Sequence, residues 1–174
     1  MRMHKWAGIF ALDVQYEQVV CRHWSSRKDD PMANVEQSVM IRAPVEKVFG
    51  YAADPSHLPE FWPSMMEVKD IQPLPSGGNR FRWVYQMAGM RFDGTSDDVE
   101  YLTNQQLIQK GKGGIESTIT WTFQSEAGGT RVTFLAEYVV PVPLLGRLAE
   151  AVIVKVNEHE TEVLLANLKA RMEA

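Results

Sequence analysis

Apolar and polar residues alternate along several stretches of this chain, and this alternation predicts a β-sheet. Between residues 80 and 87, Phe81, Trp83, Tyr85 and Met87 fall on one face of a strand, and mostly polar residues fall on the other. Further strands are expected at Val35–Ile41, Met65–Pro73, Arg91–Tyr101, Leu107–Lys110, Thr118–Phe123 and Val132–Tyr138. Because turn residues separate most of these stretches, the pattern favours an antiparallel sheet.

Two short helices are expected after the first strand. Pro44 has the φ angle of a first helical turn, and Val45, Val48, Phe49 and Ala52 follow it at helical spacing. The pair Asp54-Pro55 ends that helix and begins a second one, in which Asp54 or Ser56 supplies the cap. The second helix has an apolar face and stops at Pro63. That face consists of Leu58, Phe61 and Trp62.

A long helix is predicted from Leu144 to Met172. It spans roughly 42 Å, and it is the only predicted element large enough to cover the apolar face of the sheet. Glu158, Glu160 and Glu162 are assigned to its wetter part. The expected apolar stripe contains Leu145, Leu148, Val152, Val156, Val163 and Leu168.

Two stretches interrupt the pattern. The glycines of Gly111–Gly114 predict a flexible break between strands. Residues 1–31 form an N-terminal extension that ends in a polar linker. Two interpretations of it stay open: an added helix that docks on the domain, or dispensable sequence ahead of Met32. The main domain is therefore expected to comprise residues 32–174.

Composition narrows the class of protein. The 174 residues are 45% hydrophobic and 23% charged, with a net charge of −4, which is ordinary for a globular domain and gives no basic surface for nucleic acid. Cys21 is the only cysteine, so an internal disulfide is excluded and a cytoplasmic location is expected. No apolar run approaches the roughly 20 residues that span a bilayer, so no integral membrane segment is expected.

The segment VEQSVMIRAPVEKVFGYAADPSHLPEFWP, at residues 35–63, resembles the opening of a known family. Its strand, APVEKVF helix, Asp-Pro break and aromatic second helix are similar to those of the START-like, or SRPBCC, superfamily of polyketide cyclases/dehydrases and lipid-transport proteins. The resemblance implies an α+β helix-grip fold. In that fold a curved antiparallel sheet of about six or seven strands wraps around the long C-terminal helix and leaves an elongated cavity.

The resemblance also implies three kinds of function. The first is binding or transport of a hydrophobic small molecule such as a lipid, an isoprenoid quinone or a polyketide, without a cofactor. The second is a polyketide cyclase or dehydratase that uses general acid/base residues in the cavity. The third is a protein-interaction module, whose partner is another protein or a second copy of the chain. Since no catalytic motif is visible, the binding function is preferred.

The candidate ligand-binding residues are apolar and aromatic side chains expected to face one volume. The alternative interpretation for each is an ordinary core residue. Phe61 and Trp62 are candidates either for the mouth of the cavity or for a plug, and exposure of these two residues and Leu58 would favour the interaction module. The full ligand-binding set is Phe61, Trp62, Trp83, Tyr85, Phe92, Trp121, Phe123, Phe134, Tyr138, Leu148, Val152 and Val156.

Three side chains are candidates for catalysis: Tyr85, Tyr138 and His159. A buried phenol needs a hydrogen-bond partner, and a ligand can supply one. The histidines show no metal-binding spacing, so no metal site is expected. The acidic cluster Asp97, Asp98 and Glu100 is assigned to a solvated face of its strand.

Overall fold

The computed structural model describes residues 32–87, 89–139 and 147–174, and for residues 147–154 only the backbone. The N-terminal extension and the expected start of the long helix at Leu144 lie outside these residues. The elements run in the order β1 (Met32–Ile41), α1 (Val45–Ala52), the 3₁₀ helix η2 (Pro55–His57), α2 (Leu58–Phe61), β2 (Met65–Pro73), β3 (Asn79–Met87), β4 (Met90–Leu102), β5 (Gln106–Gly113), β6 (Ser117–Glu126), β7 (Gly129–Val139) and α4 (Arg147–Met172).

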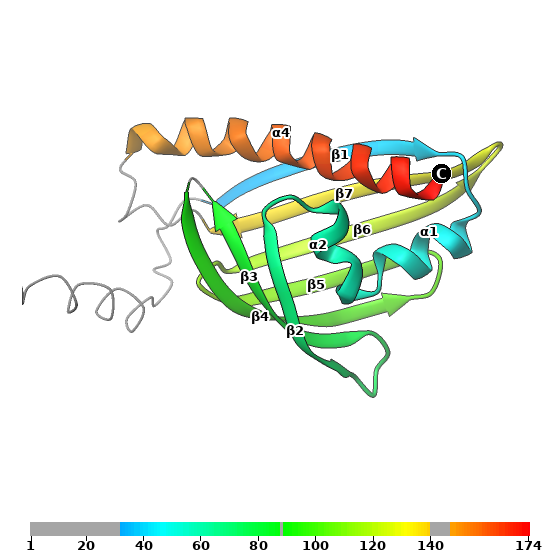
Figure 1. Ribbon diagram of the computed structural model, residues 1–174, viewed down its shortest axis with the longest axis horizontal. Coiled ribbons are helices and arrows are strands. Elements are labelled where there is room, and N and C mark those ends of the chain that lie inside the picture. The colour runs from blue at the N-terminus through cyan, green and yellow to red at the C-terminus, as the bar shows by residue number, and fades with distance from the viewer. Residues whose placement is uncertain (1–31, 88, 140–146) are drawn as a thin grey trace, which may run out of the picture.

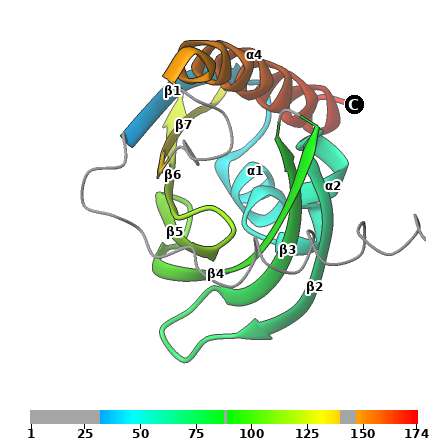
Figure 2. The ribbon, with the colours of Figure 1, turned by 90° about the vertical axis from the view of Figure 1, so that its left-hand side faces the viewer.

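The seven strands of the described residues form one antiparallel sheet in the order β1-β7-β6-β5-β4-β3-β2. The sheet is strongly curved, and α4 crosses its open side next to β1 (Figure 1). Seen from the end, the strands curl from β1 round to β2, α1 lies within the curl, and α2 lies beside the ends of β2 and β3 (Figure 2). This arrangement confirms the predicted helix-grip fold, including the two short helices and the long C-terminal helix.

The acidic cluster of β4 is divided between the two faces of the sheet. The register between β4 and β5 shifts between Asp98 and Glu100, and Val99 is left over and half exposed. Asp97 stays on the outer face, where it pairs with Arg80, but Asp98 is only 2% exposed. The assignment of all three acids to a solvated face was therefore wrong for Asp98.

The glycines of β5 do not interrupt the strand. It continues to Gly113, which pairs with Gly94 of β4. A Cβ atom on Gly94 would lie 2.4 Å from the ring of Trp83 and 2.4 Å from the carbonyl oxygen of Lys112. Glycine is needed here because the indole packs directly against the backbone of the sheet. The predicted break therefore begins later than expected, at Gly114, between the end of β5 and the start of β6 at Ser117.

The buried stripe of α4 differs from the predicted one. Val156 is 48% exposed, whereas Glu160 of the supposedly wet part faces inward and lines an internal cavity. The stripe runs back from Leu168 through Leu165 and Leu164 and then becomes polar at Thr161 and Asn157, and Val156 lies off it. The side chains that α4 buries in its described part are Asn157, Thr161, Leu164, Leu165, Leu168 and Met172.

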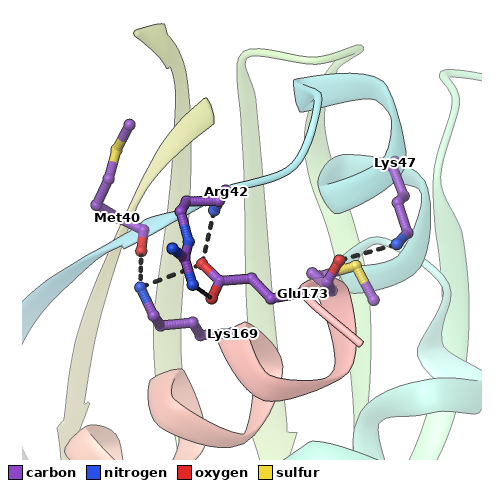
Figure 3. A network of polar contacts seen from close by, with 6 residues as sticks. Met40, Arg42, Lys47, Lys169 and Glu173 are labelled. Carbon is purple, nitrogen blue, oxygen red and sulfur yellow. Dashed lines mark hydrogen bonds and ion pairs between the residues drawn. The ribbon is translucent and has the colours of Figure 1, made fainter. Parts of the chain in front are cut away.

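The C-terminal end of α4 is held to β1 and α1 by polar contacts (Figure 3). Glu173 accepts hydrogen bonds from the backbone N–H and the guanidinium of Arg42, at 2.7 and 3.2 Å, and pairs with Lys169. Lys169 donates to the carbonyl of Met40, and Lys47 of α1 donates to the carbonyl of Met172. These contacts satisfy groups at the helix end and fix its position on the sheet.

Substitution Gly94→Ala tests the packing of Trp83 against the sheet. The added methyl group has to displace the indole or the backbone, so the free energy of unfolding should fall by about 1–3 kcal/mol. Urea titration followed by tryptophan fluorescence measures it. Gly50→Ala is the matched control, because a Cβ there meets nothing within 4 Å and the site is helical, so stability should be unchanged or raised by up to about 1 kcal/mol. Equal effects of the two substitutions would contradict the close packing of the Trp83 indole against Gly94.

Substitution Glu173→Gln tests the contribution of the α4 clasp. The backbone N–H of Arg42, with the Arg42 and Lys169 side chains, lowers the pKa of Glu173 from 4.5 to about 2. Because the folded-state pKa is lowered, the contribution to stability is present above about pH 4.5 and lost as the pH falls through about 2. The urea midpoint of the variant should therefore fall less steeply than that of the wild type between pH 5 and pH 2. Glu36→Gln, at an exposed position of β1, should keep the wild-type slope.

Candidate functional site

A cavity lies between the concave face of the sheet and α4, with a volume of about 80 Å³. Its walls come from all seven strands of the sheet, α4 and the segment around α2. The apolar part of the lining includes Trp62, Phe81, Trp83, Met87, Ile115 and Phe134. The polar part consists of Tyr85, Tyr138, Ser96, Gln109, Ser117, Asn157, Glu160 and Thr161. Apolar walls with a few placed polar groups are typical of small-molecule sites.

Aromatic rings fill the interior on one side of this cavity. Trp121 packs edge-to-face on Phe134 with ring centroids 4.6 Å apart, and on Phe61 at 6.3 Å. Phe123 lies against Trp121 and against Phe49 of α1. Of these five rings, only that of Phe134 reaches the cavity. The interior is therefore a packed core towards α1 and a cavity beyond it.

Glu160 is the carboxylate of the described cavity lining. Its Oε1 accepts a hydrogen bond of 2.9 Å from the indole N–H of Trp62, and its Oε2 accepts one of 2.7 Å from the hydroxyl of Tyr85. Trp62 ends α2, Tyr85 lies in β3 and Glu160 in α4, so one carboxylate joins three elements. Both oxygens act as acceptors, as they do in an ionised carboxylate.

Tyr138 and Asn157 form a second polar pair in the cavity wall. The side-chain N–H of Asn157 donates to the Tyr138 oxygen, and the backbone carbonyl of Asn157 accepts from Thr161. The Tyr138 O–H is therefore still able to donate. The side-chain oxygen of Asn157 is buried and has no hydrogen-bond partner. A buried acceptor without a partner costs free energy, which a ligand with a donor can recover.

Both tyrosines stay protonated at neutral pH. Burial raises the pKa of Tyr85, and the charge of Glu160 together with its hydrogen bond raises it further. Burial likewise raises the pKa of Tyr138, as do the charges of Glu160 and Glu158, while the hydrogen bond from Asn157 opposes the shift. The two phenols can therefore donate hydrogen bonds or protons, but they are poor bases.

A third polar group lies at the β4–β5 side of the cavity. Ser96 accepts a hydrogen bond of 3.1 Å from the indole N–H of Trp83. Behind the cavity wall, Asp98 accepts 2.9 Å from Gln109 and 2.6 Å from the backbone N–H of Asn79. Burial raises the pKa of Asp98, and these two hydrogen bonds oppose the shift. The buried carboxyl thus holds Gln109 in place.

Residues 32–173 match the family model described as polyketide cyclase/dehydrase and lipid transport. The chain belongs to this family. A comparison with proteins of curated function gives no match. Within the described residues, no helix is long and apolar enough to cross a membrane, and no three His, Cys, Asp or Glu side chains gather as metal ligands.

Solved structures with the same fold come from several bacteria. TTHA0849 from Thermus thermophilus has a TM-score of 0.71 and 24% identity, over 80% of this chain and 97% of that one. The Zhui aromatase/cyclase from Streptomyces sp. R1128 has a TM-score of 0.70 and 17% identity, over 82% and 94%. A START superfamily protein from Mycobacterium smegmatis has a TM-score of 0.68 and 16% identity, over 80% and 97%. These likenesses concern the fold.

The structure brings only part of the predicted ligand-binding set to the cavity. Trp62, Trp83, Tyr85, Phe134 and Tyr138 line it. Four predicted residues do not line the cavity: Phe61, Trp121 and Phe123 are buried in the surrounding core, and Phe92 is partly buried against it.

The structure places none of the predicted site residues of α4 in the described lining of the cavity. Val156 points to solvent, since the valine pattern misplaced the buried stripe. The side chains of Leu148 and Val152 lie outside the described residues. The side chain of His159, proposed as catalytic, is 78% exposed and lies near Glu162, 3.6 Å away, on the outer face of the helix. It is not at the cavity.

The sequence analysis missed Asn157, Glu160 and Thr161, the polar residues that α4 brings to the cavity. A signal for them exists: they continue the stripe of Leu164 and Leu168 at helical spacing. Polar residues on the extension of an apolar stripe are expected where a helix passes from a packed core to a polar cavity. For Ser96 and Gln109 the signal is strand alternation, which places Ser96 on the face of Phe92 and Gln109 on the face of Leu107.

Substitution Tyr85→Phe tests the Glu160 contacts. It removes one of the two donors to a part-buried carboxylate and should lower the free energy of unfolding by about 2 kcal/mol, as measured by urea titration. Tyr51→Phe is the matched control, because the Tyr51 hydroxyl also donates 2.7 Å to a glutamate, Glu60, but at an exposed site. Its effect should be within about 0.5 kcal/mol. Equal losses in the two variants would show that Glu160 has no special role.

Proposed function

We propose that this chain binds a hydrophobic small molecule in the cavity between the sheet and α4. The observation that carries the proposal is the buried, unpartnered oxygen of Asn157 in a wall that is otherwise largely apolar. A buried acceptor that faces a cavity can be satisfied by a ligand that brings a donor into that cavity. The family description, which includes lipid transport, agrees with this function. A lipid, an isoprenoid quinone or a polyketide is the expected class of ligand.

The cavity has to enlarge to hold such a molecule. Its volume of about 80 Å³ is below the roughly 300–1,000 Å³ of ligand pockets. Met65 and Met87 in its wall are unbranched and adopt several rotamers, so they can move aside at low cost. We therefore expect binding to displace side chains rather than strands.

A cyclase or dehydratase is the alternative function. The contact between Tyr85 and Glu160 favours it, because a carboxylate base and a phenolic donor then lie in one cavity. Tyr138 would donate to a ketone oxygen while Glu160 removed a proton from the neighbouring carbon. The binding function is preferred over catalysis because both oxygens of Glu160 already accept hydrogen bonds, from Trp62 and from Tyr85. The interaction module loses its support, since Leu58, Phe61 and Trp62 are buried.

Native mass spectrometry of protein purified without detergent, followed by solvent extraction, tests the proposal. A stoichiometric apolar compound should be released from the wild type. Ala136→Leu should reduce its amount at least about fivefold, because Ala136 lines the cavity and three added carbons fill it.

Ala166→Leu is the matched control, since it makes the same change on the exposed face of α4 and should retain the compound. A wild-type protein that carries no compound and binds none from a panel of lipids, quinones and polyketides would contradict the binding function. Recovery of a chemically altered compound after incubation would favour the enzyme instead.

A further inference from the structure

The charged groups that the described residues place in and behind the cavity wall are carboxylates. Glu160 places a carboxylate in the wall, and Asp98 places another behind Gln109. None of the described residues that line the cavity is a lysine, an arginine or a histidine. A second negative charge brought into such a site is repelled, and it would also lose its hydration without gaining a cation as partner.

The unused hydrogen-bonding groups point to a different kind of ligand end. The Tyr138 O–H has a proton to donate, and the Asn157 oxygen, in a side chain only 7% exposed, has room to accept. A hydroxyl group is both acceptor and donor, so it satisfies the two at once. A ketone oxygen can accept the hydrogen bond from Tyr138 but has no proton to donate, so it leaves the Asn157 oxygen without a partner.

We infer that the ligand of this cavity is an uncharged molecule that presents a hydroxyl group to Tyr138 and Asn157, and that Glu160 excludes anionic lipids such as fatty acids. The inference rests on the proposed binding function and narrows it. Tyr138 and Asn157 are then the residues that orient the ligand. Glu160 has a double role: its hydrogen bonds hold Trp62 and Tyr85 in the wall, and its charge selects against carboxylates and phosphates.

The charge of Glu160 already acts across the cavity. It raises the pKa of Tyr138 as well as that of Tyr85, which means that it opposes the formation of a negative charge at either phenol. A ligand carboxylate held at Tyr138 would meet the same opposition. In a medium of low dielectric constant this repulsion corresponds to roughly tenfold or more in affinity.

Two sets of probes with matched skeletons test the inference: toluene, benzyl alcohol and benzoate, and 2-methylnaphthalene, 2-naphthylmethanol and 2-naphthoate. Binding at pH 7 is measured by tryptophan fluorescence, since Trp62 and Trp83 line the cavity, and by calorimetry. In at least one set the alcohol should bind most tightly, with the carboxylate at least about tenfold weaker.

Three variants separate the contributions. Tyr138→Phe and Asn157→Leu should each reduce the preference for the alcohol over the methyl compound about threefold to tenfold. Glu160→Gln keeps the size of the side chain, removes its charge and should strengthen binding of the carboxylate. Glu162→Gln is its control, because this glutamate is 61% exposed on the same helix, and it should change nothing.

The outcomes distinguish the two proposals. A carboxylate that binds the wild type as well as the alcohol, or an alcohol that binds no better than the methyl compound, overturns the inference and leaves the binding function standing. Failure of all six probes to bind contradicts the binding function, and the inference falls with it.

Discussion

The concave face of the sheet is apolar and has to be covered, and within the described residues α4 is the element that runs along it (Figure 1). Polar contacts near its end and at its middle fix how it lies. The clasp around Glu173 holds its end to β1 and α1, and Glu160 ties its middle to α2 and β3. The helix therefore cannot slide along the sheet without breaking contacts to charged groups, and the cavity under it has defined walls.

The sequence was sufficient for the fold because the fold depends on pattern. The alternation at Phe81, Trp83, Tyr85 and Met87 predicts a strand whose four side chains all line the cavity, as they do. The break at Asp54-Pro55 was also correct, and the side chain of Asp54 caps the following turn through Ser56. Such signals are local, so they can be read without knowing the tertiary structure.

The site was less predictable because it depends on register and on packing across the sheet. The bulge at Val99 shifts the inward-facing position from Glu100 to Tyr101, whose ring packs on Phe49, and nothing in the local sequence marks it. Which aromatic rings fill the core and which line a cavity is decided by neighbours distant in sequence, as for Trp121 against Phe61. The polar residues of α4 were missed for a simpler reason: they were judged by polarity, although their spacing places them on the buried stripe.

The two halves of the interior have different tolerance for change. Around Trp121 and Phe49 the rings touch on all sides, so a substitution there creates a cavity or a clash and reduces stability. Around Met87 and Ile115 the side chains already border empty space, so many replacements alter the shape of the cavity without breaking a packed contact. Ligand preference can thus diverge within this fold at small thermodynamic cost. In directed evolution, libraries should vary the cavity-lining residues around Met87 and Ile115. The packed rings around Trp121 and Phe49 should be kept constant.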